Sequence, residues 1–162
     1  MRNFPHCYAI SAVASASDDV SLEGVGLPAV MSAPPVEFDG PGDRWSPETL
    51  LVAALAGCFV LTFRAIAKAS RFDWTALTCA ATGTLDRVDG VTRFTAFTVN
   101  ASLQVPAVAD EERARRLLER AESACLVSNS LKAGCRFEAD VHVLPAVPQG
   151  AAVAVGALDE QC

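Results

Sequence analysis

The chain has 162 residues, a formal net charge of −6 and 51% hydrophobic residues. This length fits one domain with a substantial buried core. The acidic balance argues against a nucleic-acid partner, because phosphate backbones are bound by clustered basic side chains. The chain has 6 cysteines and 2 histidines without a Cys-x-x-Cys pair, so neither a metal site nor a thioredoxin-like motif is expected.

The start of the chain has no apolar segment of the kind that marks a secretory signal peptide. The longest uninterrupted apolar run, Leu50–Leu61, has 12 residues, which is shorter than a membrane-spanning helix needs. We therefore expect a cytoplasmic protein that does not enter a membrane. Its cysteines are then expected to be reduced thiols.

The first third of the chain predicts short strands followed by a loop. Residues 4–31 contain short alternating segments, which indicate two strands with a turn at Asp18–Asp19. Residues 33–45 are rich in proline and glycine, and this composition is typical of a loop.

A long helix is expected next. Ser46 can cap the free amides, Pro47 suits the first helical position, and Glu48 lies at the positive end of the helix dipole. The helix is predicted to run to about Ser70. Its first half, Leu50–Leu61, is apolar on every side, which is typical of a helix that is enclosed all round.

A β-hairpin is predicted after this helix. Leu77–Val88 and Val91–Val105 flank Asp89-Gly90, a pair that strongly favours a two-residue hairpin turn. In the second arm, apolar and polar residues alternate, which predicts one buried and one wet face.

The last elements are an amphipathic helix and a strand. Asp110 is the expected cap of a helix from Glu111 to about Ser128, and Arg136–Leu144 is the expected strand. The apolar positions that share one face of this helix are Leu117, Leu118, Ala121 and Cys125. The order of elements predicts an α+β fold with mainly antiparallel sheets.

The domain is expected to cover residues 1–144. Residues 145–162 form a tail rich in Ala, Val, Gly and Pro, which we expect to be loosely ordered.

Two cysteines lie on predicted buried helix faces, Cys58 on the first helix and Cys125 on the second. Both can be simple core residues, because a free cysteine packs as a small hydrophobic group. If the helices pack together, however, the two thiols become neighbours. Such a pair can reduce a peroxide through a sulfenic acid and then a disulfide. The residues alone leave both interpretations open.

The other cysteines are interpreted as packing or incidental residues. Cys79 and Cys135 lie on strands, whereas Cys7 and Cys162 lie near the termini. A cysteine hydrolase that pairs Cys58 with a histidine is a weaker hypothesis, because nothing in the sequence positions either histidine.

Two segments resemble the OsmC/Ohr family of osmotically induced and organic hydroperoxide resistance proteins. Ser46–Phe59 (SPETLLVAALAGCF) resembles the first cysteine helix of that family, and Ala121–Lys132 (AESACLVSNSLK) resembles its second cysteine motif. The resemblance covers roughly residues 4–144 and implies an α+β fold in which two subunits intertwine as a homodimer around two long central helices. It also implies thiol-dependent reduction of organic hydroperoxides, often with a lipoyl-type dithiol as the reductant.

Carried over to this chain, the resemblance makes Cys58 the peroxidatic thiol and Cys125 the resolving thiol. Glu48 matches the family's acidic residue ten positions before the first cysteine. Ten residues of helix span about 15 Å, so Glu48 is expected to act across the dimer interface on the partner's Cys58. The family's arginine position falls near Glu37-Phe38 here, and Arg44 is the candidate substitute.

The leading hypothesis is therefore a cytoplasmic, homodimeric thiol peroxidase that reduces hydrophobic organic hydroperoxides in oxidative stress defence, without a cofactor or metal. The alternative is an OsmC-like binding protein that holds a hydrophobic ligand at the dimer interface, with redox-sensitive but weakly catalytic thiols. The missing arginine motivates this alternative, because a thiolate in the middle of a helix needs a stabilising neighbour.

Overall fold

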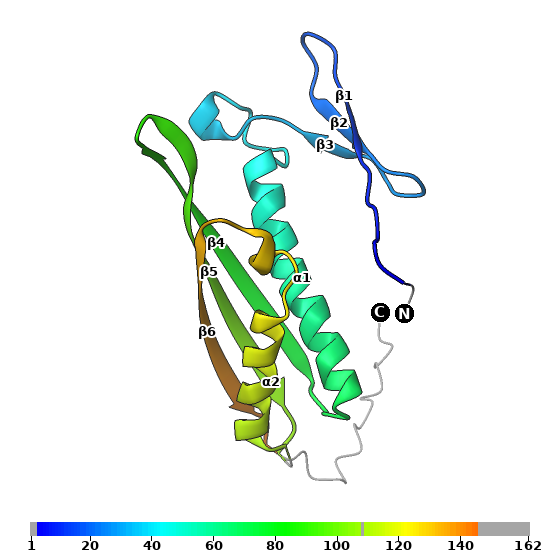
Figure 1. The fold of residues 1–162 in the computed structure, drawn as a ribbon, viewed down its shortest axis with the longest axis vertical. Coiled ribbons are helices and arrows are strands. Elements are labelled where there is room, and N and C mark those ends of the chain that lie inside the picture. Colours follow the sequence, from blue (N-terminus) through cyan, green and yellow to red (C-terminus); the bar gives the residue numbers. More distant parts are fainter. Residues whose placement is uncertain (1–2, 108, 146–162) are drawn as a thin grey trace, which may run out of the picture.

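A computed structural model describes residues 3–107 and 109–145. Two three-stranded sheets and two α-helices make up the fold (Figure 1). In chain order the elements are β1 (Ser11–Val13), β2 (Val20–Glu23), β3 (Val30–Ser32), the 3₁₀ helix η1 (Val36–Phe38), α1 (Pro47–Ala69), β4 (Ala76–Val88), β5 (Val91–Val105), α2 (Glu111–Ser123), the 3₁₀ helix η2 (Ser128–Ser130) and β6 (Gly134–Val143). The predicted α+β class is confirmed.

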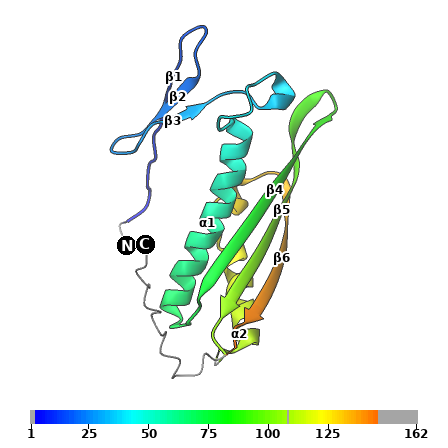
Figure 2. The same ribbon diagram turned by 180° about the vertical axis from the view of Figure 1, so that it is seen from behind.

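The larger sheet, β4-β5-β6, carries both α-helices on one face (Figures 1 and 2). β4 and β5 form the predicted hairpin, in which Val88 pairs with Val91 across Asp89 and Gly90. Both turn residues have a positive φ, 53° and 78°, as a tight hairpin turn of this kind requires. The inward positions of β5 are almost completely buried, which confirms the predicted alternation; they are Phe97, Val99, Ala101, Leu103 and Val105.

The last strand departs from the antiparallel pattern. β6 pairs parallel to β5, with Val99 opposite Phe137. The chain returns to the same end of the sheet through α2, because a parallel pair needs a crossover connection. The other three strand pairings are antiparallel, so the sheets are mainly antiparallel, as predicted.

Helix α1 begins and ends close to the predicted positions. The Ser46 hydroxyl accepts a hydrogen bond from the Thr49 N–H at 3.2 Å, and the Thr49 hydroxyl accepts one from the Ser46 N–H at 2.8 Å. This reciprocal pair satisfies two free amides. At the other end, Arg71 has a φ of 50° and the Phe72 N–H donates to the Ala67 carbonyl at 2.9 Å, which closes the helix.

Only one face of α1 is covered by its own chain. The buried residues recur every four positions and are Leu55, Phe59, Phe63 and Ala67. Leu61, on another side of the helix, is 61% exposed. The prediction of a helix enclosed all round therefore does not hold within one chain.

By length and composition, α1 is also apolar enough to cross a membrane. Its most apolar window has a mean hydropathy of 2.2, so the uninterrupted run of 12 residues understates the apolar length of this helix. The core helix of a soluble protein meets the same criterion. Here α1 packs along β4 and against α2.

Helix α2 is shorter than predicted, and the description of two long helices does not hold. α1 has 23 residues and α2 has 13, because α2 ends at Ser123 and not near Ser128. The Ser123 hydroxyl bonds back to the Glu119 carbonyl, and the Asn129 side-chain amide donates to the Ser123 carbonyl at 3.0 Å. These side chains satisfy the end of the helix and allow the chain to turn. Cys125 therefore lies in the turn after α2, and the prediction that it lies on the helix is wrong.

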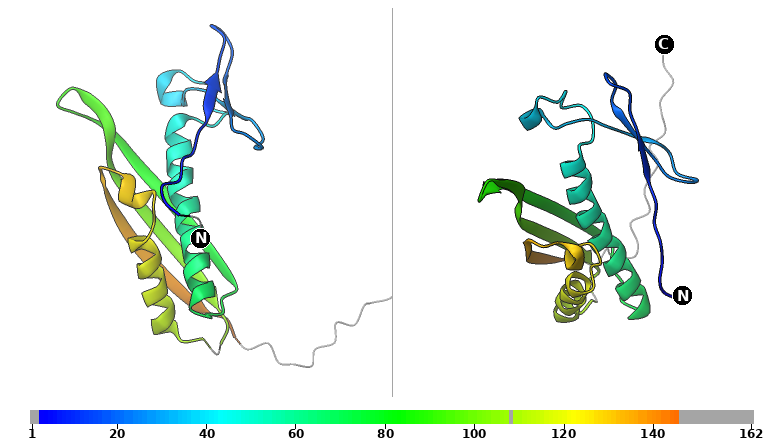
Figure 3. Two further views of the ribbon diagram at one scale, coloured as in Figure 1. Left: turned by 45° about the vertical axis from the view of Figure 1, so that its right-hand side comes forward. Right: turned by 45° about the horizontal axis from the view of Figure 1, so that its top comes forward.

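The smaller sheet, β1-β2-β3, stands beyond the N-terminal end of α1, away from the larger sheet (Figures 1 and 3). Two of its strands were expected; the third, β3, in which Val30 pairs with Leu22 of β2, was not. The predicted loop over residues 33–45 contains η1 and returns at Trp45, whose carbonyl accepts the Ala33 N–H at 3.0 Å. The predicted tail lies, from residue 146 onward, outside the described residues.

Candidate active site

The packing of α1 against the end of α2 brings Cys58 and Cys125 together. Cys58 is partly buried on α1, whereas Cys125 is 1% exposed in the turn after α2. Each thiol interacts with the other, and both are free of disulfide bonds. Residues that are 67 positions apart in the sequence thus form a pair of neighbouring thiols.

The surroundings of Cys58 favour its thiolate. Burial acts to raise the pKa of Cys58, since it disfavours the charged form. The Val127 N–H, the Cys125 thiol, the Leu126 N–H and the Thr62 hydroxyl act in the opposite direction and outweigh burial, so the pKa of Cys58 lies below its ordinary value. A thiol with a lowered pKa is a candidate nucleophile.

The surroundings of Cys125 favour its protonated form. Burial raises the pKa of Cys125, and the neighbouring Cys58 raises it further. The N–H groups of Ser128 and Val127 offset this only in part. Cys58 therefore ionises first, next to a thiol that keeps its proton.

The main-chain N–H groups that lower the pKa of Cys58, and those that act on Cys125, all belong to the turn after α2. Hydrogen bonds from the Cys125 N–H to the Glu122 carbonyl and from the Asn129 N–H to the Cys125 carbonyl, each 3.0 Å long, hold it in place. The Ser130 hydroxyl adds a bond to the Leu126 carbonyl at 2.7 Å. Sequence reasoning missed this contribution, because a main-chain amide is the same in every residue type. Thr62 could have been found, because it lies four positions after Cys58 on a helix.

Two further thiols, Cys79 and Cys135, lie near the pair, and their pKa values are raised, unlike that of Cys58. Burial, together with the nearby Cys125 and Cys135, raises the pKa of Cys79 to about 11. Burial also raises the pKa of Cys135. Of these four thiols, Cys58 alone has a lowered pKa, so Cys79 and Cys135 fit their interpretation as packing residues.

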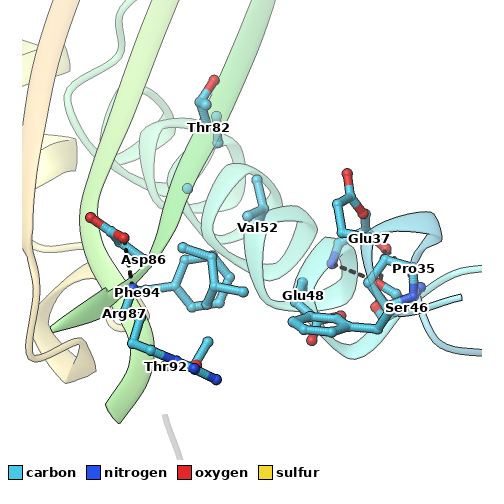
Figure 4. Close-up of a pocket in the computed structure, with 15 residues that line it drawn as sticks. Pro35, Glu37, Ser46, Glu48, Val52, Thr82, Asp86, Arg87, Thr92 and Phe94 are labelled. Atoms are coloured by element: carbon cyan, nitrogen blue, oxygen red, sulfur yellow. Dashed lines mark hydrogen bonds between the residues drawn. The ribbon is translucent and has the colours of Figure 1, made fainter. Parts of the chain in front are cut away.

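Glu48 lies at a cavity of about 740 Å³ between η1, the first turns of α1 and the turn end of the β4–β5 hairpin (Figure 4). Its lining includes Glu37, Phe38, Glu48, Val52, Asp86, Arg87 and Phe94. Glu48 Oε2 is buried and has no hydrogen-bond partner among the described residues. Cys58 does not line this cavity, and ten residues of continuous helix separate it from Glu48, which is about 15 Å. A single chain does not bring these two residues together.

Arg44 is occupied elsewhere. Its guanidinium forms ion pairs with Asp19 and Asp43, both at 2.9 Å. It does not line the Glu48 cavity. Within residues 3–107 and 109–145, no group of three His, Cys, Asp or Glu side chains is arranged to hold a metal ion.

Comparison with known proteins identifies the family. The family model described as OsmC-like protein matches residues 40–140, which include Glu48, Cys58 and Cys125. The chain is 26% identical over 117 residues to the protein YmaD of Bacillus subtilis, across 67% of this chain and 75% of YmaD.

Several solved structures share the fold. An OsmC-like protein of unknown function from Vibrio cholerae superposes with a TM-score of 0.76 at 18% identity, over 84% of this chain and 100% of the other. An organic hydroperoxide resistance protein OsmC from Legionella pneumophila gives 0.66 at 22% identity, over 85% and 98%. The organic hydroperoxide resistance protein OhrB of Bacillus subtilis gives 0.60 at 17% identity, over 83% and 98%. With the family model matched over most of the fold and both cysteines inside the match, this chain belongs to the OsmC-like protein family.

Proposed function

We propose that this chain is a thiol peroxidase that reduces organic hydroperoxides, with Cys58 as the peroxidatic thiol and Cys125 as the resolving thiol. The observation that carries the proposal is that Cys58 on α1 and Cys125 in the turn after α2 are neighbours; the lowered pKa of Cys58 and the raised pKa of Cys125 support the two roles. The names of the Legionella and Bacillus OhrB relatives support organic hydroperoxides as the substrate class.

The reaction takes place in three steps. The Cys58 thiolate attacks the outer oxygen of the hydroperoxide, the O–O bond breaks, and the alkoxide takes up a proton and leaves as an alcohol. The resulting Cys58 sulfenic acid condenses with the Cys125 thiol, which forms a disulfide and releases water. A dithiol reductant, for which a lipoyl-type compound is the candidate, then reduces the disulfide by exchange and is itself oxidised to a disulfide.

The working unit in this proposal is a homodimer in the cytoplasm. The chain leaves apolar surface uncovered in two places, the open side of α1 with Leu61 and the small N-terminal sheet with Val13 and Met31. In the proposed dimer, these exposed apolar side chains face the second subunit. In such a dimer, Glu48 of one subunit can reach the partner's Cys58, which its own helix does not allow.

The test is the consumption of cumene hydroperoxide with dihydrolipoamide as the reductant. We expect turnover by the native protein and a loss of about a thousandfold or more in Cys58→Ser, because the variant lacks the nucleophile. Cys79→Ser is the matched control, since it removes a nearby thiol that the mechanism does not use, and it should keep its activity.

Cys125→Ser separates the two proposed roles. It should still react once with hydroperoxide and accumulate a Cys58 sulfenic acid that dimedone traps. Unchanged turnover in Cys58→Ser would refute the proposed role of that residue. A native protein without turnover that purifies with a bound lipid-like molecule would point to the binding-protein alternative.

A further inference from the structure

The cavity at the start of α1 contains a carboxylate oxygen that is not satisfied. Glu48 Oε2 is buried and has no partner among the described residues. A buried polar atom without a hydrogen bond costs about 1–3 kcal/mol, and more when it carries charge. We therefore looked for a hydrogen-bond donor that can reach the Glu48 carboxylate.

The cavity offers one cation for this purpose. Arg87, near the end of β4, is the only basic residue among those that line the cavity. Across the described part of the chain, its guanidinium forms no ion pair with an acidic side chain. Arg44 is held by Asp19 and Asp43, and the loop facing the cavity contributes Glu37, another acid.

Arg87 and Phe94 both come from the β4–β5 hairpin and line the cavity. The β4–β5 register shifts between Thr84 and Leu85, and a bulge of this kind bends a strand and redirects the side chains that follow it. Phe94 packs over Gly83, where a Cβ would come within 2.7 Å of the ring, and it stacks on the buried Phe97 with ring centroids 5.0 Å apart.

These contacts fix Phe94 as one wall of the cavity. Figure 4 shows Arg87 and Glu48 on two sides of the cavity, from the hairpin and from α1.

We propose that Arg87 pairs with Glu48 across this cavity and is the positioning residue for the Glu48 carboxylate. The inference rests on the proposed function, because it assigns to the hairpin the guanidinium that the loop before α1 lacks. A guanidinium can donate two parallel N–H bonds to a carboxylate, which fixes the orientation of the acid. The paired side chains would close the polar side of the cavity and leave Val52 and Phe94 to face the apolar part of a hydroperoxide.

The test is a double-mutant cycle on the full chain, with Arg87→Ala, Glu48→Gln and the double variant. Turnover of cumene hydroperoxide and thermal unfolding are both measured. Arg87→Ala should lower kcat/KM by about tenfold to a hundredfold, and the double variant should be no worse than the weaker single variant, because the two side chains act as one unit. Arg87→Lys should restore part of the activity and change the pH profile, since an ammonium is a point charge without the planar fork.

Arg93→Ala is the matched control. Arg93 lies opposite Asp86 in the same hairpin but does not line the cavity, so its removal should change kcat/KM by less than about twofold. If Arg87→Ala behaves like Arg93→Ala in turnover, the positioning role is wrong.

If the native protein shows no turnover, the proposed function is wrong. The pairing of Arg87 with Glu48 can still be tested in that case, because thermal unfolding of the same variants measures it without an activity assay. Coupling between Arg87 and Glu48 that is absent between Arg93 and Glu48 supports the pair. Additive effects at Arg87 and Glu48 overturn it.

Discussion

The two sides of α1 both carry large apolar side chains but have different surroundings. On one side, Phe59 and Phe63 are at most 1% exposed and meet the rings of Phe137 and Trp74, with centroids 5.3 and 5.5 Å away. On the other side, Leu61 is 61% exposed. The first side contributes to the stability of the single chain, whereas the second contributes only if another surface covers it. Composition does not separate the two roles, but the structure does.

The largest loss of stability is expected from a substitution on the packed side of α1. Phe63→Ala should lower the free energy of unfolding by about 3–5 kcal/mol, because it removes a ring from a closed core and leaves a cavity. Urea denaturation measures this loss. Lys68→Ala, an exposed change on the same helix, is the control and should change stability by less than about 0.5 kcal/mol. A loss below about 1 kcal/mol in Phe63→Ala would mean that this side is not the core side.

A substitution on the exposed side of α1 should change the affinity between subunits. Leu61→Arg puts a charge on the proposed interface and should weaken dimerisation by about 2 kcal/mol or more, which is about thirtyfold in the dissociation constant. Leu61→Met keeps the side apolar and serves as the control. Sedimentation equilibrium over a range of concentrations measures both. A Leu61→Arg variant that associates like the native chain would show that α1 is not the interface.

A smaller effect is expected on the sheet that covers the packed side, where Cys79 lies. Its pKa is raised to about 11 from an ordinary value of 9.0, so the folded state keeps this thiol protonated. Above pH 9 the unfolded chain ionises Cys79 and the folded chain does not. Stability should therefore fall as the pH rises from about 9 to 11.

Cys79→Val should remove this part of the pH dependence, which thermal unfolding at pH 8, 9, 10 and 11 would reveal. A native curve and a Cys79→Val curve with the same slope would contradict the assignment.

Much of the fold is predictable because local chemistry determines it. Ser46 caps α1, Asp89-Gly90 turns the hairpin, and the alternation in β5 identifies its buried face. The side of α1 that the sheet covers was not predictable, because a helix that is apolar all round carries no directional signal. The end of α2 was not predictable either, since it depends on the Asn129 side chain reaching back to the Ser123 carbonyl.

The neighbouring thiols of the candidate site were predictable, but the groups that surround Cys58 were not. Cys58 and Cys125 stand out from sequence patterns, and the structure places them together. From the sequence, the expected stabiliser of the thiolate was a cationic side chain, with Arg44 as the candidate. The structure surrounds Cys58 instead with main-chain amides and the Thr62 hydroxyl, which no residue pattern encodes directly.

The roles proposed for Cys58 and Cys125 are tested most directly by mapping the disulfide that one equivalent of hydroperoxide forms. The reduced protein is treated with cumene hydroperoxide, free thiols are blocked with N-ethylmaleimide, and the peptides are identified by mass spectrometry. We expect a disulfide between Cys58 and Cys125, with Cys79 and Cys135 recovered as blocked thiols. Recovery of Cys58 as a blocked thiol after the hydroperoxide has been consumed would contradict these roles.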